Sequence, residues 1–135
     1  MKPLRILVAE DEFLIRIMLV EMLESLGHEV CASTSSQDET VQAALLTTPD
    51  LMIVDVRLGA GSGIAAVERI LQSGFIPHVF ATGDIPTDGG LHERAVAMRK
   101  PYDEADLVRA IALAAGRGDS APTARWTSRA RSSSE

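Results

Sequence analysis

Runs of apolar residues with the length of a β-strand alternate with longer stretches of helical periodicity along most of this chain. Residues 6–9 and residues 51–54 each contain four consecutive apolar side chains, a pattern typical of strands that are buried on both faces. From residue 13 to residue 26 the apolar side chains recur at helical spacing, and Gly27 follows as a helix stop. The chain therefore begins as a strand followed by a helix.

The same alternation continues to about residue 115 and predicts five strands and five helices. The predicted strands cover residues 5–9, 28–33, 51–55, 78–82 and 95–99. The predicted helices cover residues 13–26, 37–46, 64–72, 91–94 and 104–115, the fourth being short because residues 84–90 hold two glycines and a proline. Strands alternating with helices indicate an α/β protein with a doubly wound parallel sheet and helices on both faces.

Local signals mark several of these helix ends. The segment from Ser36 to Glu39 has the pattern of a capping box, and Asp103 is suited to cap the last helix. Gly116 is expected to stop that helix. Beyond it the composition shifts to Gly, Ser, Ala and Arg, which predicts one domain over residues 1–115 and a flexible Arg/Ser-rich tail over residues 116–135.

Composition and charge narrow the class of protein. A chain of 135 residues with 46% hydrophobic content has room for one compact core, and a formal net charge of -6 disfavours a general nucleic-acid binder. The single cysteine, Cys31, cannot form an internal disulfide and fits a reducing compartment. The apolar run at residues 6–9 is too short for a signal peptide or a membrane span. We therefore expect a cytoplasmic protein.

Polar side chains follow four of the predicted strands, at the point where each strand ends. Glu10 and Asp11 follow the first strand and Asp55 ends the third, whereas Thr82 and Lys100 end the fourth and fifth. In an open α/β sheet, functional groups gather outside the carboxyl ends of the strands. The pattern predicts three carboxylates, one hydroxyl and one ammonium at a single edge of the sheet.

This set of side chains suits phosphoryl transfer with a divalent cation. Clustered carboxylates repel one another, and a hard cation such as Mg²⁺ with oxygen ligands offsets that repulsion. Magnesium keeps open positions for water and phosphate oxygens, which leaves Asp55 free to act as a nucleophile. Lys100 and the Thr82 hydroxyl have the chemistry to hold phosphoryl oxygens.

At these residues the sequence resembles the receiver domains of two-component response regulators. The resemblance rests on the Glu10-Asp11 pair, on Asp55 after four apolar residues, on Thr82 within Phe80-Ala81-Thr82-Gly83, and on Lys100-Pro101-Tyr102. It extends over about residues 4 to 115. The tetrapeptide at Thr82 is similar to the FATGUY group of receivers, many of which stand alone without an output domain.

The resemblance implies a role for each residue. It implies that Asp55 is the phosphoacceptor. The ligands of Mg²⁺ would be the carboxylates of Glu10, Asp11 and Asp55 and the backbone carbonyl of Arg57. Thr82 and Lys100 would contact the phosphoryl group. It further implies a cis Lys100-Pro101 bond and the flavodoxin-like strand order 2-1-3-4-5.

The same resemblance implies the place of the protein in signalling. The partner would be a sensor histidine kinase or a histidine phosphotransfer protein, and the protein would be a switch rather than an enzyme, self-catalysing its phosphorylation and dephosphorylation at most. No membrane partner is expected and nucleic acid is disfavoured. The downstream target and the formation of a homodimer stay open.

The sequence departs from the family at two positions and leaves alternatives. Ala97 stands three residues before the lysine, where receivers commonly carry an aromatic switch residue, and no tyrosine follows Gly83 closely. A receiver-like interaction module that takes no phosphate fits the same residues. A haloacid-dehalogenase-like Mg²⁺-dependent phosphatase fits less well, because it expects a second acid where Arg57 stands.

Overall fold

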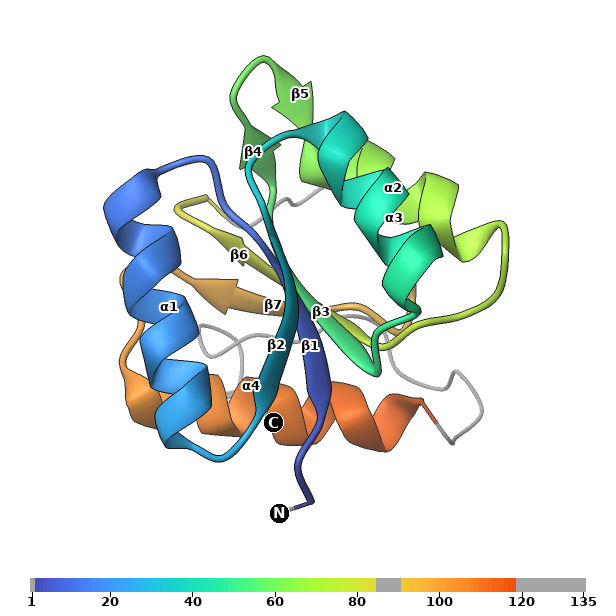
Figure 1. Cartoon of the computed structure of the whole chain (residues 1–135). Coiled ribbons are helices and arrows are strands. Elements are labelled where there is room, and N and C mark those ends of the chain that lie inside the picture. The colour runs from blue at the N-terminus through green and yellow to red at the C-terminus, as the bar shows by residue number, and fades with distance from the viewer. Residues whose placement is uncertain (1, 85–90, 119–135) are drawn as a thin grey trace.

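The computed structural model describes residues 2–84 and 91–118 and shows a parallel sheet between two layers of helices (Figure 1). The sheet consists of β1 Arg5–Ala9, β2 Glu29–Thr34, β3 Leu51–Asp55, β6 His78–Thr82 and β7 Val96–Arg99. The helices are α1 Phe13–Ser25, α2 Gln37–Thr47, α3 Gly63–Leu71 and α4 Glu104–Arg117. The strand order is β2-β1-β3-β6-β7, which confirms the predicted flavodoxin-like order of the five strands.

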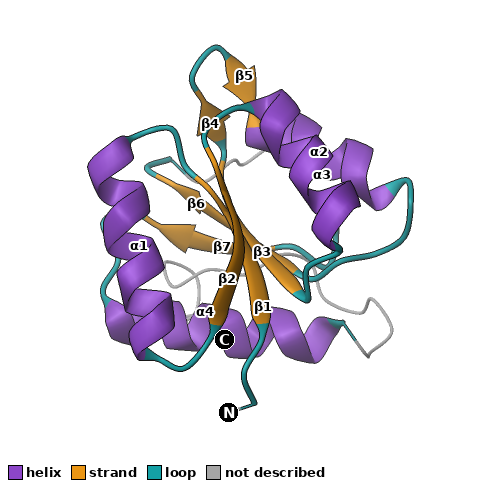
Figure 2. Ribbon diagram, viewed as in Figure 1, coloured by secondary structure: helices purple, strands orange, loops and turns teal. Residues whose placement is uncertain are grey.

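Each face of the sheet has its own apolar core, because successive side chains of a strand point to opposite faces. Ile6 and Val8 of β1 pack with α1 and α4, whereas Leu7 between them packs on the side of α2 and α3. All three side chains are fully buried. Figure 2 shows the same division, with the helices on either side of the orange strands. The continuous apolar runs seen in the sequence follow from this two-sided burial.

Three predicted helix-end signals are present near α1, α2 and α4, and one of them forms only in part. Gly27 adopts a left-handed φ of 96° after α1, and Asp103 forms a reciprocal capping box with Asp106 at the start of α4. The Ser36 hydroxyl accepts a hydrogen bond from the Glu39 amide, as expected of an N-cap. The reverse bond of the predicted capping box is absent at Ser36, because the Glu39 carboxylate accepts from the amide and hydroxyl of Ser35 instead.

A small hairpin that the sequence pattern missed follows β3. It pairs β4 Arg57–Leu58 with β5 Gly61–Ser62 in antiparallel fashion. Gly63 then starts α3 so close to β3 that a side chain there would collide with the carbonyl oxygen of Asp55. The glycines of this loop therefore permit a tight return of the chain past the end of β3.

Two predictions for the last third of the chain were wrong: a short helix and the end of the last helix. Residues 91–94 form a turn rather than the short helix that was expected, and residues 85–90 lie outside the described residues. Gly116 does not end the last helix, since α4 continues to Arg117. The Arg117 guanidinium donates to the Ala95 carbonyl at 3.2 Å, a tertiary contact that holds the last residue of the helix. Among the helices of the described ranges, none has both the length and the apolarity needed to cross a membrane.

Candidate functional site

The predicted site residues meet at the carboxyl ends of four parallel strands. Glu10 follows β1, Asp55 ends β3, Thr82 ends β6 and Lys100 follows β7. Asp55, Thr82 and Lys100 line a cleft of about 560 Å³ together with Asp11. The parallel register brings the strand ends to one edge, so residues far apart in sequence become neighbours. The predicted convergence is therefore present.

Lys100 connects two of the carboxylates. Its ammonium nitrogen lies 2.8 Å from Oδ2 of Asp55 and 3.1 Å from Oε1 of Glu10. Both carboxylates are buried, with Glu10 at 2% and Asp55 at 8% relative exposure. A buried carboxylate without a compensating partner is strongly destabilising, and one cation here serves two acids. The peptide bond between Lys100 and Pro101 is cis, as the resemblance implied.

Backbone amides hold the carboxylates from the other side. Oδ1 of Asp55 accepts from the Arg57 amide at 3.2 Å, and Oδ2 of Asp11 accepts from the Gly59 amide at 2.9 Å. The second Glu10 oxygen accepts from the Glu12 amide at 3.1 Å. The sequence predicted neither Gly59 nor Glu12 at the site, and it named Arg57 for its backbone carbonyl rather than its amide, because an amide contributes through backbone position rather than residue type. The hairpin after β3 supplies two of the three.

The three carboxylates can hold a metal ion. Ligand oxygens of Glu10, Asp11 and Asp55 lie within 4.8 Å of one another, and Asp11 is exposed to solvent while the other two are buried. An all-oxygen set with one open side suits Mg²⁺, which keeps several waters. The residues present thus fit the ion that the sequence implied.

The electrostatics of the site show an excess of negative charge. Burial, followed by the charge of Asp55, raises the pKa of Glu10 to about 7. Burial lowers the pKa of Lys100, but the hydrogen bonds and charges of Asp55 and Glu10 together outweigh it and hold the pKa above its ordinary value. Burial, and then the Glu10 charge, raises the pKa of Tyr102 to about 12. A bound divalent cation would relieve the repulsion that Lys100 balances only in part.

The Thr82 side chain is near the cleft but is engaged with its own loop. Its hydroxyl donates to the Asp84 carbonyl at 2.9 Å and lies 3.2 Å from the Asp84 amide, which donates back to it. The Arg99 guanidinium donates to the Gly83 carbonyl at 3.2 Å. Thr82 must give up its bonds to Asp84 before its hydroxyl can hold another group. The residue type was predicted from the sequence, whereas this competing arrangement was not.

Fold and site together define a flavodoxin-like α/β protein with an acidic site at the carboxyl edge of its sheet. Residues 6–112 match the family model described as the response regulator receiver domain. The chain belongs to the response regulator receiver domain family of two-component signalling.

Curated relatives and solved structures agree with this assignment. The chain is 39% identical over 121 residues to the transcriptional regulatory protein PdtaR of Mycobacterium tuberculosis, covering 85% of this chain and 58% of that protein. It is 33% identical over 113 residues to the phyllosphere-induced regulator PhyR of Methylorubrum extorquens, covering 81% and 42%. The chain thus spans about half the length of these curated relatives.

Two solved structures show the same fold. The response regulator PhyR from Brucella abortus superimposes with a TM-score of 0.70 at 30% identity, covering 84% of this chain and 48% of that one. The signal receiver domain of a modulated diguanylate cyclase from Desulfovibrio desulfuricans G20 gives 0.76 at 26% identity, covering 87% and 97%. The second of these is matched along nearly its whole length.

Proposed function

We propose that this receiver accepts a phosphoryl group on a carboxylate oxygen of Asp55, with Mg²⁺ bound by Glu10, Asp11 and Asp55. The observation that carries the proposal is the position of Asp55, which ends β3 with its carboxylate 2.8 Å from the Lys100 ammonium and close to the carboxylate oxygens of Glu10 and Asp11. Such a carboxylate has a cation beside it to neutralise charge that develops during transfer. The receiver family is generally a switch rather than an enzyme.

The phosphoryl donor would be a phosphohistidine of a sensor kinase or of a phosphotransfer protein. A bond forms between phosphorus and an Asp55 oxygen, the phosphorus–nitrogen bond breaks, and the imidazole leaves with its electron pair and takes a proton. Bound Mg²⁺ would neutralise charge on the phosphoryl oxygens. Lys100 would hold one of those oxygens, and the Arg57 backbone carbonyl would complete the protein ligands of the metal.

Thr82 would turn phosphorylation into a conformational change. Its hydroxyl would replace its hydrogen bonds to the Asp84 backbone with a hydrogen bond to a phosphoryl oxygen. This exchange would move the start of the segment between β6 and β7. Ala97 of β7 is buried at 3% exposure and pairs with Phe80, so no aromatic ring stands at that position to follow Thr82. The response is therefore carried by the backbone of the segment after Thr82, as a shift between populated states.

The remaining functional inferences rest on the family. We place the protein in the cytoplasm, where kinases of this type present their phosphohistidine. The downstream target is a protein, and the acidic net charge of -6 disfavours nucleic acid. The alternative function is a receiver-like interaction module that takes no phosphate, and it predicts that the wild-type chain gains no phosphoryl group.

Intact-mass spectrometry after incubation with acetyl phosphate and Mg²⁺ tests the proposal. The wild-type chain should gain one phosphoryl group, and Asp55→Asn should gain none. Asp38→Asn, which changes an exposed acid on α2, is the matched control and should label like the wild type. Equal labelling of the wild type and Asp55→Asn would place the phosphate elsewhere, and no labelling of the wild type would favour the interaction module.

A further inference from the structure

The hairpin after β3 presents two backbone amides to the acids of the site. The Arg57 amide donates to Asp55 at 3.2 Å, and the Gly59 amide donates to Asp11 at 2.9 Å. The strands of this hairpin have two residues each, and an isolated two-stranded hairpin is at best marginally stable in water. The position of the two amides therefore depends on the contacts that fix the hairpin to the rest of the fold.

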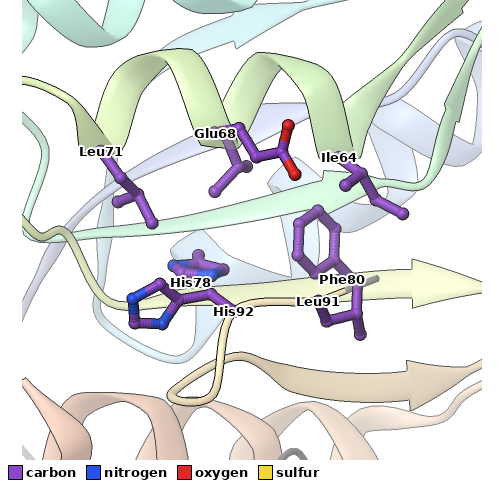
Figure 3. A pocket seen from close by; sticks show the side chains of 8 residues that line it. Ile64, Glu68, Leu71, His78, Phe80, Leu91 and His92 are labelled. Atoms are coloured by element: carbon purple, nitrogen blue, oxygen red, sulfur yellow. The ribbon is translucent and has the colours of Figure 1, made fainter. Parts of the chain in front are cut away.

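Apolar packing fixes the hairpin on the side of β4 and α3. The Leu58 side chain of β4 is buried in the core that lies under α2 and α3. Ile64 and Leu71 of α3 pack against the same core, and Figure 3 shows them with Phe80 around the small pocket between α3 and β6. The Ser62 amide on β5 has a partner outside this packing.

Gln37, the first residue of α2, binds β5. Its Oε1 atom accepts a hydrogen bond from the Ser62 amide at 2.8 Å. The two segments also lie in close contact, because a Cβ added to Gly61 would lie 2.9 Å from both the Cβ and the Oε1 of Gln37. The backbone of Gln37 is held by the capped start of α2. A side chain with a fixed base thus connects α2 to the strand that pairs with Arg57.

Asp11 is the acid that depends most on the position of the hairpin. Its side chain is exposed, whereas Glu10 and Asp55 are buried and both contact Lys100. Gly59 lies in the turn between β4 and β5, so a displacement of β5 moves the amide that holds Asp11. The charges of the other two acids repel the Asp11 carboxylate. Without the amide, this carboxylate would turn away from the metal site.

We propose that Gln37 is a positioning residue of the metal site and acts through the hairpin on Asp11. Gln37 holds β5 against α2, and the hairpin holds the Gly59 amide against the Asp11 carboxylate. Asp11 then stays within ligand distance of the other two carboxylates before the metal binds. The inference rests on the proposed function, and Gln37 itself contacts neither the metal nor the phosphoryl group.

Amide exchange in the metal-free chain, followed by NMR, tests the first step. Gln37→Met keeps the length of the side chain and removes the acceptor. It should raise the exchange rate of the Gly59 amide severalfold. The Thr40 amide, which donates to the Ser36 carbonyl within α2, should exchange as in the wild type. Unchanged exchange at Gly59 would overturn the proposal, and so would equal acceleration at both amides, since it would indicate a general loosening of α2.

Calorimetric titration with Mg²⁺, without a phosphodonor, tests the second step. Gln37→Met should bind Mg²⁺ about two- to tenfold more weakly than the wild type, the range that one net hydrogen bond supports. Gln37→Glu keeps an acceptor oxygen at the same reach and should bind Mg²⁺ no more weakly than the wild type. Gln42→Met, at an exposed position of the same helix, is the matched control and should bind like the wild type. Wild-type affinity in Gln37→Met, or weakened binding in Gln37→Glu, would contradict the positioning role.

Gly61→Ala disturbs the same contact from the side of the hairpin. The added Cβ should force β5 away from Gln37 and lower the Mg²⁺ affinity as Gln37→Met does. The double variant should lose less affinity than the sum of the two single losses, because both substitutions remove one contact. Additive losses would refute the shared contact.

The two readouts separate this inference from the proposed function. Mg²⁺ binding by the wild type, with equal affinity in Gln37→Met, would refute the positioning role alone. If the wild type binds no Mg²⁺, the proposed function fails, and the exchange rate of the Gly59 amide in Gln37→Met still decides whether Gln37 positions the hairpin.

Discussion

The Lys100 ammonium lies 3.1 Å from Oε1 of Glu10, a contact that joins the strand ends of β1 and β7 across the sheet. The same nitrogen lies 2.8 Å from Asp55. Lys100 therefore has a structural role in balancing two buried acids besides its proposed role at the phosphoryl group. The two roles can be separated by measurements with and without metal.

Lys100→Met should lower the free energy of unfolding of the metal-free protein by about 1 to 3 kcal/mol, because two buried carboxylates lose their cation. Saturating Mg²⁺ should stabilise this variant more than the wild type, since it replaces the missing positive charge. Urea unfolding with and without Mg²⁺ measures both effects. Lys2→Met, at an exposed position, is the control and should change neither. Equal Mg²⁺ stabilisation of wild type and Lys100→Met would contradict the shared charge balance.

Asp11→Asn should weaken Mg²⁺ binding by about tenfold or more while the protein still folds. The asparagine oxygen can keep the 2.9 Å bond from the Gly59 amide, so the loop is retained while one anionic ligand is lost. Removing one of three mutually repelling charges should also leave the metal-free protein as stable as the wild type or more so. Calorimetric titration gives the affinity. Glu12→Gln is the matched control, and a similar loss in both variants would refute the assigned ligand.

His78 should make the stability of the protein depend on pH. Its folded pKa of about 4 is below the unfolded value of 6.5, so its contribution is present above pH 6.5 and is lost as pH falls toward 4. Between about pH 7 and about pH 5 the wild type should lose roughly 2 kcal/mol relative to His78→Phe. The comparison with the variant cancels Glu10, whose raised pKa acts in the opposite direction. Parallel stability curves from denaturant unfolding would rule out this linkage.

Two truncations test where the folded domain ends. A chain ending at Gly118 should keep the unfolding midpoint of the full protein, because the composition of residues 119–135 predicts no core contacts. A chain ending at Gly116 should melt a few degrees lower, since it loses the Arg117 bond to the Ala95 carbonyl and the Gly118 amide bond to the Ala115 carbonyl. Thermal unfolding followed by circular dichroism measures both. A drop of several degrees for the longer truncation would show that the tail docks.

Thr82→Ala should uncouple phosphorylation from the conformational response. The variant should still label on Asp55, but amide exchange between Thr82 and Val96 should no longer slow on phosphorylation or on binding beryllofluoride. In the wild type, phosphorylation should raise the amide-exchange protection between Thr82 and Val96 more than the protection of α1. The proposed backbone response of the segment after Thr82 is wrong if this segment and α1 respond equally in the wild type, or if Thr82→Ala responds like the wild type.

The sequence by itself determined the strands, their order of appearance and the acids at their ends. Consecutive apolar residues predict a buried strand such as β3, because both faces of a central parallel strand are covered. The rule that functional groups collect at the carboxyl edge of an α/β sheet then predicts that Glu10, Asp55 and Lys100 lie close together. These features are local patterns or general consequences of the α/β topology.

Only the tertiary structure decided the contacts made by backbone and by neighbouring elements. Gly116 stays helical because Arg117 finds the Ala95 carbonyl across the fold, so a glycine that often stops a helix does not stop this one. The pairing of Arg57 with Ser62 fixes the hairpin whose amides hold Asp55 and Asp11. The orientation of the His78 ring depends on a contact between its Nδ1 and the Ile76 carbonyl two residues away, and the depressed pKa of the ring depends on its burial. Such outcomes depend on distances between segments, which the order of residues along the chain does not contain.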